Sequence, residues 1–420
     1  MNTGRTGDGG LAVTPQMQKI LNQSGFISIK MGSEKLRRMF QTQFGKLDLD
    51  RLSAFAFACI CGKYEAVQQA ISSGTAPDLA TTETPFQLGF ISFAILGAQR
   101  LRGGPPGTTM RHHEVIQYLL ASGAPPDVPD ISGHTALHHA CTPPIGHAEM
   151  TKLLLEKGAN VNAQNRYGEV PIFFPFQGGD IALVDLLMEH GADLGIKDGN
   201  GDSPRKMCMV FGAEVTAAVQ RWERKRKGEQ APWEEKICEN CKTKSSGLKQ
   251  CARCRVVRYC STECQRAHWK MHKPQCNPFT ALTTITLKPN YRDFPETISR
   301  ADFTRQAFGL SNPTTRPFKA GVSKNVDFEN KSMVVKIQVP VDLLTNSPLG
   351  TSHGGLLIYN KKRDFVCTVH RGSNPTAYDA VVQTVRARGV GGAKAYFAAE
   401  LKNRDELIVK VSEVLAEQPF

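Results

Sequence analysis

The sequence predicts a multidomain protein that joins an all-α array of helical repeats, a small module built on two zinc ions, and a C-terminal α+β domain. Glycines recur at a spacing of 33 residues in the first half of the chain. Within residues 238–276, seven cysteines and one of the two histidines follow the spacing of metal ligands, and residues 277–420 hold short alternating runs. A chain of 420 residues suits about two to four domains. Its 40% hydrophobic residues are enough for packed cores.

Residues 1–48 are predicted to hold a disordered start followed by capping helices. The first 14 residues are rich in Gly, Thr and Asp, and such a composition buries little apolar surface. Thr14 before Pro15, and Ser33 before Glu34, are typical helix starts. We expect the two helices to cover the exposed apolar end of the first repeat.

Residues 49–221 contain a recurring motif. It includes Thr135-Ala136-Leu137-His138-His139-Ala140 and the glycines Gly158 and Gly191, which lie 33 residues apart. These residues are similar to the opening and the close of an ankyrin repeat, so the segment resembles an array of such repeats. The resemblance implies two helices and a turn per repeat, which bury their apolar faces by stacking. We expect a proline at position 175 to shorten or kink its helix. The expected repeats lie near residues 52–82, 83–130, 131–164 and 165–197, with a terminal half-repeat over 198–221.

Solenoid surfaces are extended binding platforms, so the array is expected to bind protein partners, with a plain spacer as the alternative. A linker over residues 222–236 follows it. This linker begins with the basic run Arg224-Lys225-Arg226-Lys227, which is either a nuclear-import signal or a solvated helix end.

The zinc module is predicted over residues 237–276. Its gaps read C-x2-C-x9-C-x2-C-x5-C-x3-C-x7-H-x3-C, and eight such ligands complete two tetrahedral zinc sites with no position left for a catalytic water. The spacing leaves the pairing of the ligands open. A unit of 39 residues with few large apolar side chains depends on metal for its stability. The ligands are Cys238, Cys241, Cys251, Cys254, Cys260, Cys264, His272 and Cys276.

The same segment resembles a MYND-type zinc finger, through Tyr259-Cys260-Ser261 and Cys264-Gln265-Arg266-Ala267-His268-Trp269. The resemblance implies interleaved sites, in which Cys238 and Cys241 share one zinc with Cys260 and Cys264. It also implies that Gln265 and Trp269 line a shallow groove for proline-containing peptides. Simple packing of Trp269 against the zinc sites is the alternative. His268 is interpreted as a surface residue.

The finger holds nine basic and two acidic residues between its first and last ligand. Positive charge attracts phosphate without specificity, and the ligand spacing differs from that of the two-cysteine, two-histidine fingers whose helix reads bases. Proteins rather than nucleic acids are therefore the expected partners. A DNA-binding transcriptional regulator stays as an alternative.

Residues 277–420 are predicted to form an α+β domain. Residues 332–339 alternate like a strand, residues 356–359 and 364–369 read as a hairpin, residues 376–388 as a helix, and residues 407–411 as a further strand. MYND fingers also occur beside methyltransferase and hydroxylase domains. The Asn-His-Ser/Cys signature is missing, Cys367 is the only cysteine after the finger, and neither His353 nor His370 begins a His-x-Asp pair.

The protein is therefore predicted to be a zinc-binding adaptor or regulatory protein with no catalytic residues. The alternative is a protein lysine methyltransferase or other enzyme in the C-terminal domain. The start of the chain has no apolar signal segment, and no run of about 18 apolar residues marks a membrane span. The cytoplasm or the nucleus, where thiols stay reduced, is the expected location.

Overall fold

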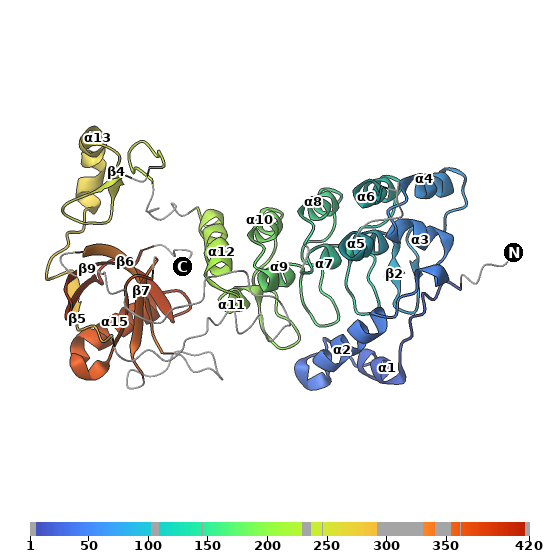
Figure 1. The fold of residues 1–420 in the computed structure, drawn as a ribbon, viewed down its shortest axis with the longest axis horizontal. Helices are drawn as coiled ribbons and strands as arrows, with labels where there is room; N and C mark the ends of the chain where they lie inside the picture. The colour runs from blue at the N-terminus through green and yellow to red at the C-terminus, as the bar shows by residue number, and fades with distance from the viewer. Residues whose placement is uncertain are drawn as a thin grey trace. The chain divides into compact units, whose positions relative to one another are not determined.

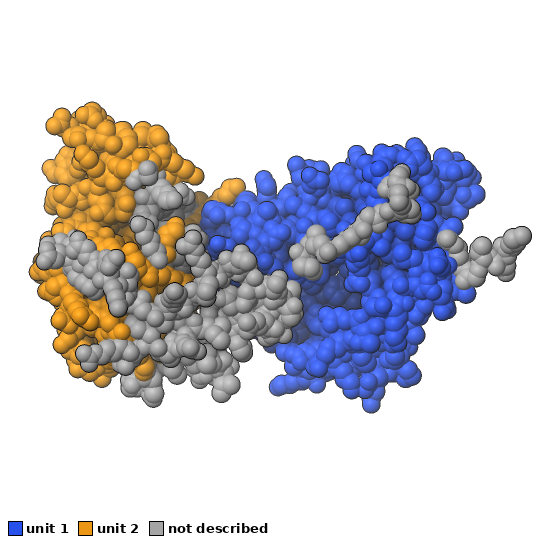
Figure 2. All heavy atoms as spheres, viewed as in Figure 1, with its two compact units in different colours: residues 1–222, 303–311 blue, residues 223–302, 312–420 orange. Residues whose placement is uncertain are grey.

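The computed structural model describes residues 6–101, 109–143, 146–228, 237–245, 247–291, 331–340, 354–361 and 363–415. It separates into two compact units, residues 1–222 with 303–311 and residues 223–302 with 312–420 (Figure 2). Among the described helices, none is both long and apolar enough to cross a membrane.

Five helix pairs stack side by side in the described part of the first unit (Figure 1). Each pair buries a stripe of apolar side chains, such as Val67, Val115 and Leu154, in one continuous core. The last pair replaces the half-repeat expected over residues 198–221. The first helices are α3 (Ala54–Ile60), α5 (Phe90–Arg100), α7 (Ala136–Ala140), α9 (Phe173–Gly178) and α11 (Pro204–Met207). The second helices are α4 (Tyr64–Ser72), α6 (His112–Ala121), α8 (Ala148–Glu156), α10 (Ile181–Glu189) and α12 (Ala213–Arg226).

The array was expected to be all-α, but it also contains two short strands. Strands β1 (Thr82–Glu83) and β2 (Leu88–Gly89) pair antiparallel ahead of α5. Thr84 and Gln87, with φ of 69° and 55°, form the tight turn between them. Pro175 lies in the first turn of α9, where the missing N–H costs no helical hydrogen bond. The proline therefore fits this helix.

Residues 6–14 of the described chain pack against the array, which differs from the disordered start expected over these residues. Leu11 is buried, and the Gly7 N–H donates to the Arg51 carbonyl at 2.8 Å. Helix α1 (Pro15–Leu21) begins where predicted, with the Thr14 hydroxyl accepting from the Met17 N–H. The turns η1 (Ile29–Met31) and η2 (Leu49–Arg51) lie on either side of α2 (Ser33–Phe44).

Helices α1 and α2 lie beside the loops of the array (Figure 1), rather than over the end of the first repeat. The Arg166 guanidinium, in the loop before α9, donates to the carbonyls of Leu21, Gln23 and Gly25. Arg37 of α2 pairs with Glu169 at 2.9 Å. The expectation missed this because the contacts join residues more than 100 positions apart.

The C-terminal part of the second unit is a curled antiparallel sheet with the strand order β5-β10-β9-β6-β7-β8. Asn290, just beyond β5, exchanges two backbone hydrogen bonds with Thr368 of β8, so the two edges of the sheet meet there. We call this sheet and its helix α15 (Pro375–Arg388) the barrel. The strands are β5 (Thr284–Leu287), β6 (Lys331–Gln338), β7 (Leu356–Asn360), β8 (Val366–Val369), β9 (Lys394–Asn403) and β10 (Glu406–Lys410), and the turn η4 (Arg371–Ser373) precedes α15.

The two faces of the sheet are covered by different parts of the chain. Phe397 and Ala399 of β9 pack with Tyr378 and Val381 of α15 in one core. The alternate residue Tyr396 packs instead with the zinc finger. The predicted strands, hairpin and helix are all present, whereas β5 and β9 were missed. Strand β9 is apolar on both faces and therefore lacks the alternation that marks a half-buried strand.

The zinc finger itself is small. Strands β3 (Lys249–Gln250) and β4 (Arg258–Tyr259) pair antiparallel, and α13 (Thr262–His272) and the turn η3 (Lys273–Gln275) complete it. Apart from the residues of the cysteine and histidine pattern, Val256 and Tyr259 are the buried side chains among the described residues of the finger, at 3% and 1% exposure. Such a core is too small to fold the finger without metal.

Candidate metal centre

The two C-x2-C pairs of the finger form matching turns. The Lys242 N–H donates to the Cys238 carbonyl at 2.8 Å, and the Arg255 N–H donates to the Cys251 carbonyl at 2.9 Å. Lys242 and Arg255 each follow the second cysteine of a pair and have left-handed φ values of 56° and 57°. This turn directs both sulfur atoms of a pair to the same side.

Helix α13 supplies one ligand from each end. The Ser261 hydroxyl caps the helix by accepting from the Cys264 N–H at 3.2 Å. Cys264 lies in the first turn and contributes to one group, whereas His272 ends the helix and contributes to the other. One short helix thus links both groups.

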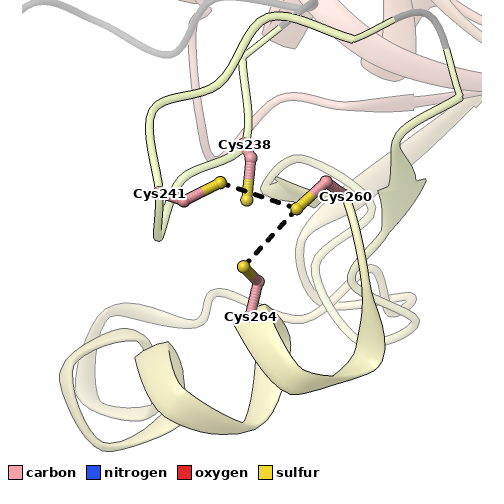
Figure 3. A group of neighbouring side chains, drawn as sticks. All are labelled: Cys238, Cys241, Cys260 and Cys264. Carbon is pink, nitrogen blue, oxygen red and sulfur yellow. Dashed lines mark hydrogen bonds between the residues drawn. The ribbon is translucent and has the colours of Figure 1, made fainter.

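The first group consists of Cys238, Cys241, Cys260 and Cys264, and we call it site 1. The four sulfur atoms point toward one another from the first turn, the end of β4 and the start of α13 (Figure 3). Cys260 Sγ lies 3.5 Å from Cys241 Sγ and 3.4 Å from Cys264 Sγ. Cys241 and Cys260 are exposed, so one side of this site faces solvent.

The second group consists of Cys251, Cys254, His272 and Cys276, and we call it site 2. Cys251 Sγ lies 4.0 Å from Cys276 Sγ, and Cys254 Sγ lies 3.6 Å from His272 Nε2. All four residues are buried. The interleaved arrangement implied by the MYND resemblance is the one that the structure contains.

Both groups have the geometry of tetrahedral zinc sites. The ligand atoms of each group lie within 4.8 Å of one another. A zinc–sulfur distance of about 2.3 Å gives sulfur–sulfur edges of about 3.8 Å in a tetrahedron, close to the 3.4–4.0 Å found here. Four thiolates, or three thiolates with one imidazole, are the donor sets of structural zinc, so the two clusters fit two zinc ions.

Local hydrogen bonds and burial shift the pKa values of the ligands in different directions. Hydrogen bonds from Thr243 lower the pKa of the Cys241 thiol to about 6. Burial raises the pKa of the Cys276 thiol to about 12. Burial also lowers the pKa of His272, which keeps its imidazole neutral and able to bind metal. Zinc binding therefore has to displace protons from some of these thiols.

Gln265 and Trp269 lie one turn apart on α13, and both are partly exposed. The Trp269 ring contacts the His272 ring edge-on, with 5.8 Å between centroids. The Trp269 side chain thus packs against site 2 and is also partly exposed. His268 is half-buried rather than on the surface as expected, because its Nδ1 lies 3.1 Å from the Tyr259 hydroxyl.

One residue that supports site 2 was missed. Lys410 of β10 is fully buried, and its ammonium donates to the carbonyl of the ligand Cys254. The only sign in the sequence is a lysine in the otherwise apolar run Leu407-Ile408-Val409-Lys410-Val411. A charged residue on a strand is usually exposed, so the pattern did not identify it.

Comparisons with known proteins match two parts of the chain. A stretch of 153 residues is 33% identical to ankyrin repeat and KH domain-containing protein mask-1 of Caenorhabditis elegans, covering 36% of this chain and 5% of that protein. A stretch of 91 residues is 36% identical to E3 ubiquitin-protein ligase KEG of Arabidopsis thaliana, covering 21% and 6%. A stretch of 45 residues is 49% identical to N-lysine methyltransferase SMYD2 of Homo sapiens, covering 11% and 10%.

The chain thus spans at most a tenth of the length of each of these three relatives. The family model for ankyrin repeats matches residues 109–198 in three copies, and the model for the MYND finger matches residues 238–276. This protein therefore carries ankyrin repeats and a MYND finger whose two ligand clusters fit two zinc ions.

Proposed function

We propose that the protein is a non-catalytic adaptor that binds other proteins through its MYND finger and its ankyrin array. The observation that supports this most is the closure of both metal sites. Each cluster offers four protein ligands, so a tetrahedral zinc ion in either one has no open position for a substrate or water. Two bound zinc ions would then be structural, and the surface that they hold in shape would bind the partner.

On the finger, we propose that Gln265 and Trp269 bind short proline-containing peptides. Residues four apart on a helix share one face, and a partly exposed indole next to an amide suits a proline ring and its neighbouring carbonyl. The contact between Trp269 and His272 fixes the indole beside the buried site 2. A rigid aromatic side chain loses little entropy on binding.

A binding titration of the full chain with proline-containing peptides tests this site. Trp269→Ala should weaken binding about tenfold or more, since one aromatic anchor contributes several kcal/mol at an interface. Lys270→Ala, which changes an exposed neighbour, is the matched control. The zinc content of each variant must equal that of the wild type, so that a loss of binding is not a loss of fold. Unchanged affinity in Trp269→Ala would exclude the groove.

The absence of catalysis is a separate part of the proposal. The match to N-lysine methyltransferase SMYD2 covers only 45 residues. Incubation of the full chain with labelled S-adenosylmethionine and a mixture of proteins should leave all of them unlabelled. Transfer of label to any protein would contradict the proposed absence of catalysis. Loss of that label when the barrel is deleted, but not in the Trp269→Ala variant, would place the activity in the barrel.

On the array, the side that carries the loops is already in contact with α1 and α2. We therefore propose that protein partners use the surface left by the first and second helices. We also propose that the protein works in the cytoplasm or nucleus, where cysteine thiols stay reduced and can bind zinc.

A further inference from the structure

A buried lysine links the finger to the barrel. Lys410 of β10 has 0% exposure. Its Nζ donates to the Cys254 carbonyl at 3.3 Å, to the Asn277 carbonyl at 2.8 Å and to the Glu413 carboxylate at 2.7 Å. An ammonium group has three protons, so each finds an acceptor. This satisfied network is what makes a buried charge tolerable.

Both carbonyl acceptors of Lys410 belong to site 2. Cys254 is one of its ligands, and Asn277 directly follows the ligand Cys276. A zinc ion with three thiolates and one imidazole carries a net negative charge, which the adjacent ammonium partly offsets. Both carbonyls lie at or next to residues that would ligate the metal, so coordination in site 2 would restrain the backbone that carries them.

Further contacts of the same segment tie it to the sheet. Arg255, next to Cys254, forms an ion pair with Glu400 of β9 and stacks over the Phe279 ring at 4.8 Å. The Phe279 N–H donates to the Arg253 carbonyl at 2.8 Å, and the Asn277 amide donates to the Ser412 hydroxyl at 2.9 Å. These interactions all surround site 2.

Apolar side chains also connect the finger to the barrel. Val256 of the finger forms one buried cluster with barrel side chains from three parts of the sheet region. Those side chains are Val334, Tyr396, Ala398 and Leu415. They lie on the face of the sheet opposite α15, so this face depends on the finger for its cover.

Site 1 has a different environment. Cys241 and Cys260 are exposed. The backbone around this site bonds within the finger, with the Cys238 N–H donating to Thr243 at 3.0 Å and the Glu239 N–H donating to Arg258 at 2.9 Å. Cys238 is nevertheless buried in the same cluster as the barrel side chains, and α13 joins Cys264 to His272. The exposed ligands Cys241 and Cys260 are not part of that cluster, so they are the ligands whose loss should leave the acceptors of Lys410 in place.

We propose that the two metal sites have separate roles, and that site 2 is a metal-dependent joint between the finger and the barrel. Zinc in site 2 holds the Cys254 and Asn277 carbonyls around Lys410, which is a positioning residue for this site. Loss of that zinc alone loosens the barrel, whereas loss of zinc from site 1 does not. This role goes beyond peptide binding and stands whether or not the groove binds peptides.

Amide hydrogen exchange of the full chain, measured beside its zinc content, separates the two sites. Cys241→Ala should retain one zinc ion and leave exchange in β9 and β10 within about twofold of the wild type. Cys251→Ala should also retain one zinc ion, but raise exchange in these strands about tenfold or more, as local opening costs less free energy. Equal exchange in the two variants would overturn the joint.

A second test keeps every ligand in place. In the Cys241→Ala background only site 2 holds zinc, so its release to a coloured chelator is a single process. Lys410→Met should speed this release about tenfold or more, in line with other residues that support metal ligands. Lys402→Met, which removes an exposed lysine from neighbouring β9, should change it less than about twofold. Equal release rates in these two variants would contradict the role of Lys410.

Discussion

The loop before α7 shows how single residues fix the fold of a repeat. The side chain of Asp130 is only 9% exposed, and one of its carboxylate oxygens accepts from the Ser132 N–H at 2.8 Å and from the His134 N–H at 2.9 Å. The other oxygen lies 3.2 Å from His139 Nε2. Burial alone would raise the pKa of Asp130, but the contacts with His134 and His139 outweigh it and hold the pKa well below its usual range.

Replacing this carboxylate should destabilise the array in a pH-dependent way. A lowered pKa in the folded state stabilises the protein above the ordinary value of 3.8, and this contribution is lost as the pH falls below it. Asp130→Asn should cost about 1–3 kcal/mol at neutral pH. Thermal unfolding followed by circular dichroism should show this difference shrinking below about pH 4. A difference that is the same at acid and neutral pH would show that the charge of Asp130 is not involved.

His138 lies in the motif that resembles the opening of an ankyrin repeat. Burial lowers its pKa to about 3, which keeps it neutral. Its Nδ1 accepts from the Thr135 N–H, and its Nε2 then donates to the Glu169 carbonyl of the next loop. His138 therefore stabilises both the start of its own helix and the next loop, which explains why a histidine at this position is part of a short sequence motif.

At the scale of elements, the loops of neighbouring repeats are joined by single backbone hydrogen bonds. The Arg166 N–H donates to the Ser132 carbonyl, and the Gly199 N–H donates to the Tyr167 carbonyl, both at 2.8 Å. Gly168, with φ of 77°, lets the loops approach this closely, since a Cβ there would lie 2.9 Å from the Gly199 nitrogen.

A methyl group at this position should separate the loops. Gly168→Ala should lower the free energy of unfolding by about 1–3 kcal/mol more than Gly158→Ala. Gly158 is the matched control, since its φ of 86° is also left-handed but a Cβ would meet nothing within 4 Å. Urea unfolding of both variants, followed by far-ultraviolet circular dichroism, measures the difference. Equal midpoints would mean that the loop contact contributes little.

Elements could be predicted where buried residues recur with a helical period, or where two short apolar runs are separated by polar turn residues. Helix α15 is the first case, with Tyr378, Val381 and Val385 buried on one side, and the hairpin of β7 and β8 is the second. Strand β9 was missed because α15 covers one face and the finger covers the other, so its Ala-rich sequence does not alternate. The ligands of both metal sites could be predicted because coordination chemistry fixes residue type and spacing, whereas Lys410 depends on a contact that crosses 156 residues.

For the whole molecule, the two compact units should respond differently to the loss of metal. Both zinc clusters lie in the second unit. Chelation of the full chain should therefore leave most of the helical circular dichroism, which comes from the array, and make residues 238–276 accessible to protease. Simultaneous loss of the helical signal would show that the units are not independent.

The contacts of the N-terminal segment change the kind of folding expected of the array. A linear repeat protein has contacts only between neighbours, so its ends can unfold while its centre stays folded. Here Arg166 bonds to Leu21 and Gln23, and the Asn200 side chain accepts from the Ile29 N–H, so the first residues of the chain hold the fourth and fifth helix pairs. Fraying from the C-terminal end has to break these distant contacts as well. The array should consequently unfold in one cooperative step, and it should bend and unfold from its ends less easily than an open solenoid.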